Sequence, residues 1–236
     1  MKKKLVVLSG AGISAESGLK TFRDSDGLWE GHRVEDVATL DGFKRDPEKV
    51  LRFYNERRRQ MLEAFPNRAH ILLAELEKFF NVWIVTQNVD DLHERAGSHQ
   101  VIHLHGELLK ARSSRQKELV YPWTKDILIG DLCEHGFQLR PHIVWFGEEV
   151  PLIALAAEIV KAADLLVVIG TSLQVYPAAG LIAYASDRAI IFYIDPKPMA
   201  NNLFQNLNKF QVIADKATVG MELVYQQLMK TVHLTN

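Results

Sequence analysis

The sequence predicts a doubly wound α/β fold, in which helices cover a parallel sheet on both faces. Short apolar, β-branched runs recur along the chain, helical patterns alternate with them, and the runs are apolar on both faces. Strands buried on both faces are typical of parallel sheets, and alternation with helices indicates βαβ units. A chain of 236 residues that is 47% hydrophobic can bury one sizeable core of this kind.

The predicted elements follow one another along most of the chain. The predicted strands cover residues 4–8, 82–86, 101–104, 143–146, 165–169, 189–194 and 210–213. The predicted helices cover residues 47–64, 69–79, 90–95, 152–162, 177–185 and 218–229. Residues 31–65 contain a charged helix and no predicted strand, and residues 110–139 are mixed. We therefore expect a single domain over residues 1–236, with a large lobe from residues 1–30, 66–109 and 139–236 and a small inserted lobe from residues 31–65 and 110–138.

Composition and charge bear on which partners the protein binds and in which cellular compartment it works. Charged residues make up 24% of the chain and the net charge is −1, which favours neither a nucleic acid nor a membrane surface as partner. The only cysteine, Cys133, excludes an internal disulfide and a four-cysteine zinc site. The apolar run at residues 5–8 is too short for a signal peptide, and no run approaches the roughly 18 apolar residues of a membrane span. We expect a cytoplasmic protein.

A glycine-rich loop follows the first predicted strand. Residues 10–15 read GAGISA and fit the pattern G-x-G-x-x-A. Gly10 would permit a tight turn, and Gly12 would let the backbone approach a pyrophosphate at a helix N-terminus. A dehydrogenase would add a strand ending in an acidic residue about 20 residues further on, but residues 21–29 are polar and show no strand periodicity. The loop is compatible with dinucleotide binding, although glycine-rich turns after strands are common, and its surroundings are not those of a hydride-transfer enzyme.

Polar side chains follow the next two predicted strands. Gln87, Asn88 and Asp90 come after the strand at 82–86, where open α/β sheets place ligands, although Asp90 could instead cap the following helix. His103 and His105 would share one face of the following strand. His105 stands beside a glycine at the strand end, the best setting among the nine histidines for a general base. A structural role is the usual alternative for such a histidine, and no third ligand supports a metal site.

Three further strand ends carry polar or glycine signals. The strand at 143–146 ends in a Gly-Glu pair, and the turn that begins at Gly170 and contains Ser172 suits a ribose or a phosphate. Asp195 follows the strand at 189–194 and could accept hydrogen bonds from ribose hydroxyls. Each signal alone is ordinary turn chemistry. Five such ends on one edge of a sheet indicate a binding site.

Taken together, these motifs resemble the sirtuin family over nearly the whole chain. They occur in the family's order at residues 10–14, 21–29, 86–93, 104–106, 140–148 and 170–173. The resemblance implies a sirtuin-type NAD-binding fold with a Rossmann-type large lobe and a small lobe, and with NAD and an acyl-lysine entering the cleft between them. Besides the glycines of the two loops, the residues that it implies for the NAD site are Ala11, Thr21, Arg23, Gln87, Asn88, Asp90, His105, Ser172 and Asp195.

The resemblance also implies the reaction and its catalytic residues. The acyl oxygen attacks the nicotinamide ribose, nicotinamide leaves, and the products are free lysine and O-acyl-ADP-ribose. His105 would take a proton from a ribose hydroxyl, Asn88 would orient water or ribose, and Asp90 would hold the carboxamide. Mono-ADP-ribosyl transfer and NAD hydrolysis would use the same residues and stay open as alternatives. A non-catalytic NAD or ADP-ribose binding module is a further alternative, against which the complete set of three residues argues.

Two departures from the family pattern affect these expectations. Most sirtuins hold a structural zinc with two cysteine pairs, whereas Ser113 and Ser114 stand near the place of the first pair and only Cys133 near that of the second. Hydroxyls do not replace thiolates on zinc, so we predict no zinc. Apolar packing would hold the small lobe instead, through Tyr121, Trp123, Ile127, Leu128, Leu132 and Phe137. Asp195 stands where the family usually has asparagine, and its carboxylate can still accept from a ribose.

A tyrosine and an arginine predict the acyl group. Tyr54 and Arg57 share a face of the helix at 47–64 and resemble the pair that marks sirtuins accepting succinyl- and malonyl-lysine. An arginine fork suits a distal carboxylate, although a solvated basic helix face would show the same spacing. We expect Val144 and Phe146 to bind the substrate as well. The expected partners are acylated-lysine proteins, and the expected state is a monomer.

Overall fold

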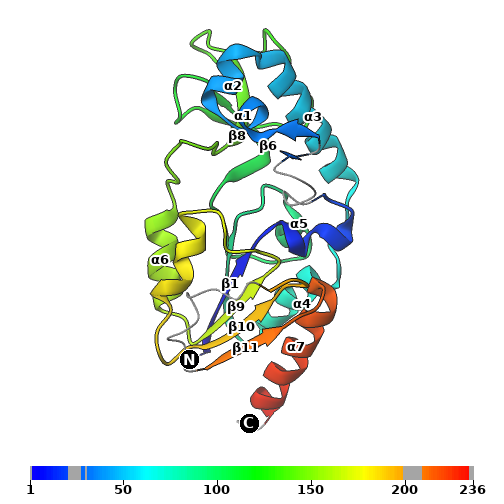
Figure 1. The fold of residues 1–236 in the computed structure, drawn as a ribbon, viewed down its shortest axis with the longest axis vertical. Coiled ribbons are helices and arrows are strands. Elements are labelled where there is room, and N and C mark those ends of the chain that lie inside the picture. The colour runs from blue at the N-terminus through cyan, green and yellow to red at the C-terminus, as the bar shows by residue number, and fades with distance from the viewer. Residues whose placement is uncertain (1, 21–27, 30, 199–208, 234–236) are drawn as a thin grey trace.

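A six-stranded, all-parallel sheet forms the centre of the larger part of the molecule (Figure 1). The computed structural model describes residues 2–20, 28–29, 31–198 and 209–233. The strand order is β11-β10-β9-β1-β4-β5. The strands are β1 (Lys4–Ser9), β4 (Asn81–Thr86), β5 (Val101–His103), β9 (Leu165–Ile169), β10 (Ile190–Ile194) and β11 (Phe210–Ile213). The predicted α/β class with a parallel sheet is confirmed.

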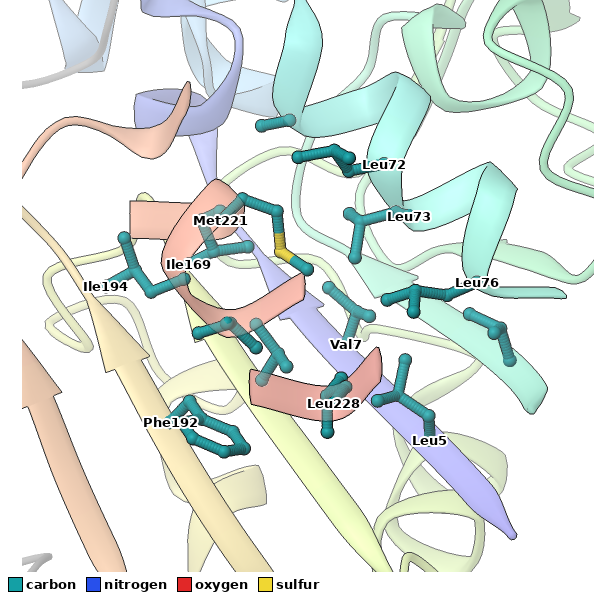
Figure 2. Close-up of a cluster of buried hydrophobic side chains, with 14 of the residues drawn as sticks. Leu5, Val7, Leu72, Leu73, Leu76, Ile169, Phe192, Ile194, Met221 and Leu228 are labelled. Atoms are coloured by element: carbon teal, nitrogen blue, oxygen red, sulfur yellow. The ribbon is translucent and has the colours of Figure 1, made fainter. Parts of the chain in front are cut away.

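Helices cover both faces of this sheet, as the two-sided apolar strands require. On one face lie α4 (Arg68–Glu75) and α7 (Ala217–His233), and on the other lie α6 (Ile153–Lys161) and the 3₁₀ helix η4 (Ala178–Tyr184). Side chains along a strand alternate between faces, so Leu5 and Val7 pack against α4 and α7, as Figure 2 shows, while Val6 and Leu8 join the opposite layer. The sheet is therefore buried on both sides.

A second, smaller group of elements lies beyond the carboxyl ends of the sheet strands (Figure 1). An antiparallel sheet of order β7-β6-β8 is built from β6 (Gly106–Ser113), β7 (Val120–Pro122) and β8 (Leu139–Ile143). The short hairpin of β2 (Leu28–Trp29) and β3 (His32–Arg33) and the helices α1 (Val34–Val37), α2 (Leu40–Arg45) and α3 (Pro47–Glu63) complete this group. Its members share a separate hydrophobic core. The strand β6 crosses the predicted boundary between residues 109 and 110, and β8 lies wholly in residues predicted for the large lobe. The division into lobes stays a prediction.

One predicted strand belongs to a different sheet. The strand expected at 143–146 is instead β8, which ends at Ile143 and pairs antiparallel with β6, not with the parallel sheet. Gly106 pairs with Ile143 and Arg112 pairs with Arg140, so the apolar residues after Ile143 form a loop against the helices of the small group. An apolar run has the same appearance whether it crosses a parallel sheet or enters a neighbouring core.

Several helix predictions differ in type or in length. The glycine loop continues as two short 3₁₀ turns, η1 (Ala11–Ile13) and η2 (Ala15–Ser17), rather than as a long helix. The helix expected at 69–79 is α4 followed by the 3₁₀ turn η3 (Leu76–Lys78), and α5 (Leu92–Arg95) begins after Asp90. The residues at 177–185 form η4, and His32–Arg33 adds a strand where none was predicted. The helices α1 and α2 had no counterpart among the predictions, whereas α3, α6 and α7 match them within a few residues.

Only part of the predicted apolar packing holds the small group together. Ile127 is buried, but Leu128 and Leu132 are 61% and 54% exposed, so their predicted packing is wrong. Tyr121, Trp123 and Phe137 pack against the core while partly exposed. A polar clamp supplements them, because the Asn55 amide donates to the Ile127 carbonyl at 2.9 Å and accepts from the Ile127 N–H at 2.9 Å. The clamp fixes the loop before β8 to α3.

None of the helices in the described residues is long and apolar enough to span a bilayer. The cytoplasmic location and the monomeric state stay predictions.

Candidate active site

A cleft of ≈ 810 Å³ opens where the sheet changes its direction of winding. The chain runs from β1 to β4 and β5 on one side of β1 and then crosses to β9, β10 and β11 on the other. Ligands of open α/β sheets bind outside the carboxyl ends of the strands at such a switch point. Gly10 follows β1 and Gly170 follows β9, and both line the cleft. Residues of α3 and of the loop after β8 close its opposite side.

The structure brings the predicted site residues together at this cleft. Thr21 and Arg23 lie outside the described residues. The other predicted residues all line the cleft, and they are Gly10, Ala11, Gly12, Tyr54, Arg57, Gln87, Asn88, Asp90, His105, Val144, Phe146, Gly170, Ser172 and Asp195.

Two glycine loops pack against each other at the base of the cleft. The N–H of Gly12 donates to the carbonyl of Gly170 at 2.8 Å. A Cβ on Gly12 would lie 2.7 Å from the Cα of Gly170, closer than real contacts allow. Gly170 has φ +63°, and a Cβ there would lie 2.2 Å from the Ile13 nitrogen. The approach of the β1 and β9 loops therefore requires both glycines, in addition to any need for space beside a ligand.

Asn88, Asp90 and Ser14 form a buried polar group beside the glycine loop. The Ser14 hydroxyl donates to Asp90 Oδ2 at 3.0 Å and accepts from Asn88 Nδ2 at 3.1 Å. Asp90 Oδ1 also accepts from the Leu92 N–H at 3.2 Å, although the cap residue of α5 is Asp91 rather than Asp90, as the alternative had it. Burial raises the pKa of Asp90 to about 6, against the hydrogen bonds from Leu92 and Ser14. Ser14 was within the predicted motif but was not singled out as a site residue.

The two strand-end histidines have different environments. His105 Nδ1 lies 3.2 Å from the Gln87 carbonyl oxygen, which only accepts, so Nδ1 carries the proton and Nε2 the lone pair of the neutral ring. Burial lowers the pKa of His105, which keeps the ring neutral near pH 7. His103 instead contacts the Asn88 carbonyl and Glu94 at 2.9 and 2.7 Å. Burial alone would lower the pKa of His103, but the hydrogen bond and the negative charge of Glu94 outweigh burial and raise this pKa. Only His105 has the character of a base facing the cleft.

Tyr54 and Arg57 enter the cleft from α3. Tyr54 is fully buried, and the Trp145 indole N–H donates to its hydroxyl at 2.9 Å. The Arg57 guanidinium lies 4.1 Å from the ring centroid of Phe53, donates to the Phe53 carbonyl at 2.8 Å, and has a side chain only 11% exposed. The alternative of a solvated helix face therefore does not hold for Arg57. The role of Trp145 as a hydrogen-bond partner had no signal in the sequence, because its partner lies 91 residues away.

The zinc ligands of the family pattern are replaced by a pair that does not suit zinc. The Cys133 thiol lies 3.5 Å from the Ser113 hydroxyl. Among the described residues, no cluster of three or more His, Cys, Asp or Glu side chains could hold a metal ion. A single thiol beside a hydroxyl falls short of the four ligands that structural zinc takes. The absence of zinc stays a prediction, which the donor set supports.

Comparisons with known proteins agree with this architecture. The Sir2 family model matches residues 10–177. The NAD-dependent protein deacylase of Helicobacter pylori is 58% identical over 228 residues, covering 97% of this chain and 98% of that protein. The enzyme of the same name from Bacteroides thetaiotaomicron is 53% identical over 234 residues, covering 96% and 98%.

Solved structures show the same fold with dinucleotide-derived ligands. A Sir2 homologue in complex with ADP-ribose superimposes with a TM-score of 0.87 at 40% identity, covering 99% of this chain and 94% of that chain. A Sir2 homologue in complex with NAD superimposes with a TM-score of 0.86 at 39% identity, covering 98% and 91%. With the family model matching most of the chain and relatives above half identity over nearly its full length, this protein belongs to the Sir2 family, the sirtuins.

Proposed function

We propose that this protein is an NAD-dependent protein-lysine deacylase that removes succinyl and malonyl groups as well as acetyl groups. The observation that carries the proposal is one cleft that contains both the strand-end set Asn88, Asp90 and His105 and the pair Tyr54 and Arg57. Relatives above half identity bear the name NAD-dependent protein deacylase, which supports the coarser activity. The acyl preference depends on the chemistry of Tyr54 and Arg57.

The residues of the cleft suit NAD. Asn88 Oδ1 is buried and, among the described residues, has no hydrogen-bond partner, so it is available to accept from a ribose hydroxyl or a water. The glycine loops at Gly10 and Gly170 allow backbone to approach phosphates, and the Asp195 carboxylate at the end of β10 can accept from ribose hydroxyls. When bound, NAD supplies the ribose that accepts the acyl group and the nicotinamide that leaves.

His105 is suited to take a proton at the carboxyl edge of the sheet. Its Nδ1–H donates to Gln87, which fixes the tautomer and leaves the Nε2 lone pair as the basic site. Because burial lowers its pKa, the ring is in its basic form at neutral pH. Asp90, with a pKa of about 6, titrates just below neutrality and can present an acceptor to an amide N–H. These properties support the assigned roles of base and carboxamide holder.

Tyr54 and Arg57 suit an acyl chain that ends in a carboxylate. The Arg57 guanidinium lies in a nearly buried position, 3.5 Å from the Glu56 carboxylate, where an ion pair is screened less than on the surface. A guanidinium offers five N–H donors and can bind a carboxylate bidentately. Burial raises the pKa of Tyr54, so its phenol stays protonated and can donate. An acetyl group lacks the distal acceptor for either residue.

The test measures nicotinamide release and deacylated peptide with NAD and either no peptide, an acetyl-lysine peptide or a succinyl-lysine peptide. Release that depends on peptide, with deacylation, is the expected result. Release without peptide would identify an NAD hydrolase, ADP-ribosylated protein would identify a transferase, and unchanged NAD would identify a binding module. Each of these three results would overturn the deacylase proposal.

A substitution on α3 tests the acyl preference. Arg57→Met should lower kcat/KM for the succinyl peptide by about tenfold to hundredfold, because a charged hydrogen bond contributes about 1.5–3 kcal/mol. Activity on the acetyl peptide should change little. Arg52→Met is the matched control, since Arg52 lies on the same helix but is exposed and outside the cleft. Desuccinylation that survives Arg57→Met, with acetyl activity also unchanged, would refute the proposed preference.

A further inference from the structure

The hydroxyl of Tyr54 can only accept, not donate, in its hydrogen bond to Trp145. The indole Nε1–H lies 2.9 Å from the Tyr54 oxygen and can only donate, so the hydroxyl accepts. The C–O–H group of a phenol lies in the ring plane, with its proton on the side opposite the accepted bond. The Tyr54 proton is therefore directed away from Trp145. The residue lines the cleft, and no bond donated by this hydroxyl is found within the described ranges.

A buried ion network holds Trp145 at both its backbone and its ring. Glu148 accepts from the Trp145 N–H at 2.9 Å, from Arg112 at 2.8 Å and from Arg140 at 2.7 Å. The Arg140 guanidinium also lies 3.7 Å from the centroid of the Trp145 ring. The side chains of the three charged residues are 2–7% exposed. Buried ion networks add little net stability, but they hold groups in one arrangement, here the indole that meets Tyr54.

We propose that Trp145 is a positioning residue for acyl-group selectivity, acting through the hydroxyl of Tyr54. Because the Tyr54 oxygen accepts the indole N–H, the O–H of Tyr54 is left to donate to a different group, one inside the cleft. A carboxylate at the end of a succinyl or malonyl chain is such an acceptor, whereas the methyl group of an acetyl chain is not. This inference rests on the acyl preference proposed above, and it adds a residue that lines the same cleft and acts on the acyl group through Tyr54.

The test follows the selectivity ratio, defined as kcat/KM for a succinyl-lysine peptide divided by kcat/KM for the matching acetyl-lysine peptide. The variants are Trp145→Phe, Tyr54→Phe and the double variant, with Trp123→Phe as the matched control. Trp123 also donates one indole hydrogen bond, to the Asp126 carbonyl at 3.2 Å, but lies outside the cleft. Trp145→Phe should lower the ratio about threefold to tenfold, as expected for the loss of one hydrogen bond that orients a donor. Trp123→Phe should leave the ratio unchanged.

The double variant separates positioning from a general structural role. Once Tyr54→Phe has removed the hydroxyl, adding Trp145→Phe should not lower the ratio further. Equal losses on both peptides, or independent losses that multiply in the double variant, would overturn the inference. If Trp145→Phe fails to fold, an unchanged ratio in Tyr54→Phe alone would overturn it as well. A wild-type enzyme that deacetylates but does not desuccinylate would refute the proposed preference, whereas a desuccinylase with an unchanged ratio in Trp145→Phe would refute only the role of Trp145.

Discussion

Replacing Asp90 by asparagine should stabilise the fold while it damages the site. Burial raises the pKa of this carboxyl from 3.8 to about 6. At about 1.36 kcal/mol for each pH unit, the ionised form costs the folded state about 3 kcal/mol. Asparagine is neutral and similar in shape, so its Oδ1 can still accept from Leu92 and its Nδ2 can donate to Ser14. We expect Asp90→Asn to raise the free energy of unfolding by about 2–3 kcal/mol at pH 8.

The direction in which stability changes with pH is specific to a buried carboxyl group whose pKa is raised. The folded protein holds the Asp90 proton more tightly than the unfolded chain, so the wild type loses stability as pH rises from 3.8 to about 6. Asparagine has no proton to lose there. The difference between variant and wild type should therefore be near zero below about pH 4, grow between about pH 4 and 6, and stay constant above that.

Urea unfolding at several pH values measures this difference directly, with activity followed in parallel. Asp91→Asn is the neighbouring control, because Asp91 is half-buried and faces Arg95 at 3.7 Å, so its replacement should change stability by less than about 1 kcal/mol. Asp90→Asn should also lose most deacylation if the carboxylate holds the nicotinamide carboxamide. A variant less stable than wild type at pH 8, or a difference independent of pH, would refute the reasoning. A variant that is more stable but inactive is expected wherever a buried charge serves function at a cost in stability.

Four other outcomes follow from the same structure. Because burial lowers the pKa of His105 and the neutral ring is the base, kcat/KM should fall only as pH drops below 6.5, and a pH–rate midpoint above 6.5 would contradict this. Glu148→Ala leaves two buried guanidinium groups without their shared carboxylate and should cost about 3–5 kcal/mol in urea unfolding, with Glu148→Gln losing less. Gly12→Ala should weaken NAD binding measured by calorimetry and lower the melting temperature, because its Cβ would lie 2.7 Å from the neighbouring loop, whereas Gly180→Ala, with only ordinary contacts, should do neither. Dialysis against a chelator should leave the melting temperature unchanged because Cys133 lacks partner thiols, and a marked fall would show a bound structural metal.

The sequence carried most of the information on secondary structure and on the edge where the site lies. Apolar runs predicted every strand of the parallel sheet, because burial on both faces leaves a local signal in composition. Polar residues directly after those runs predicted a candidate site at one edge of the sheet, since parallel strands bring their carboxyl ends to one edge. Asn88, Asp90 and His105 were found in this way, and all three line the cleft.

Other features depend on packing between segments far apart in the chain, and no local pattern encodes them. The run before Gly147 is apolar in any of these settings, and only the register of β8 with β6 shows that Ile143 ends a strand of the small antiparallel sheet. Gly12 is required by its close approach to Gly170, and the hydroxyl of Ser14 meets Asp90 only when β1 and β4 lie side by side. By itself the sequence determined which residues are apolar, polar or flexible at each strand end. The tertiary structure decided which of them meet, because hydrogen bonds such as that from Trp145 to Tyr54 depend on distance and direction across the fold.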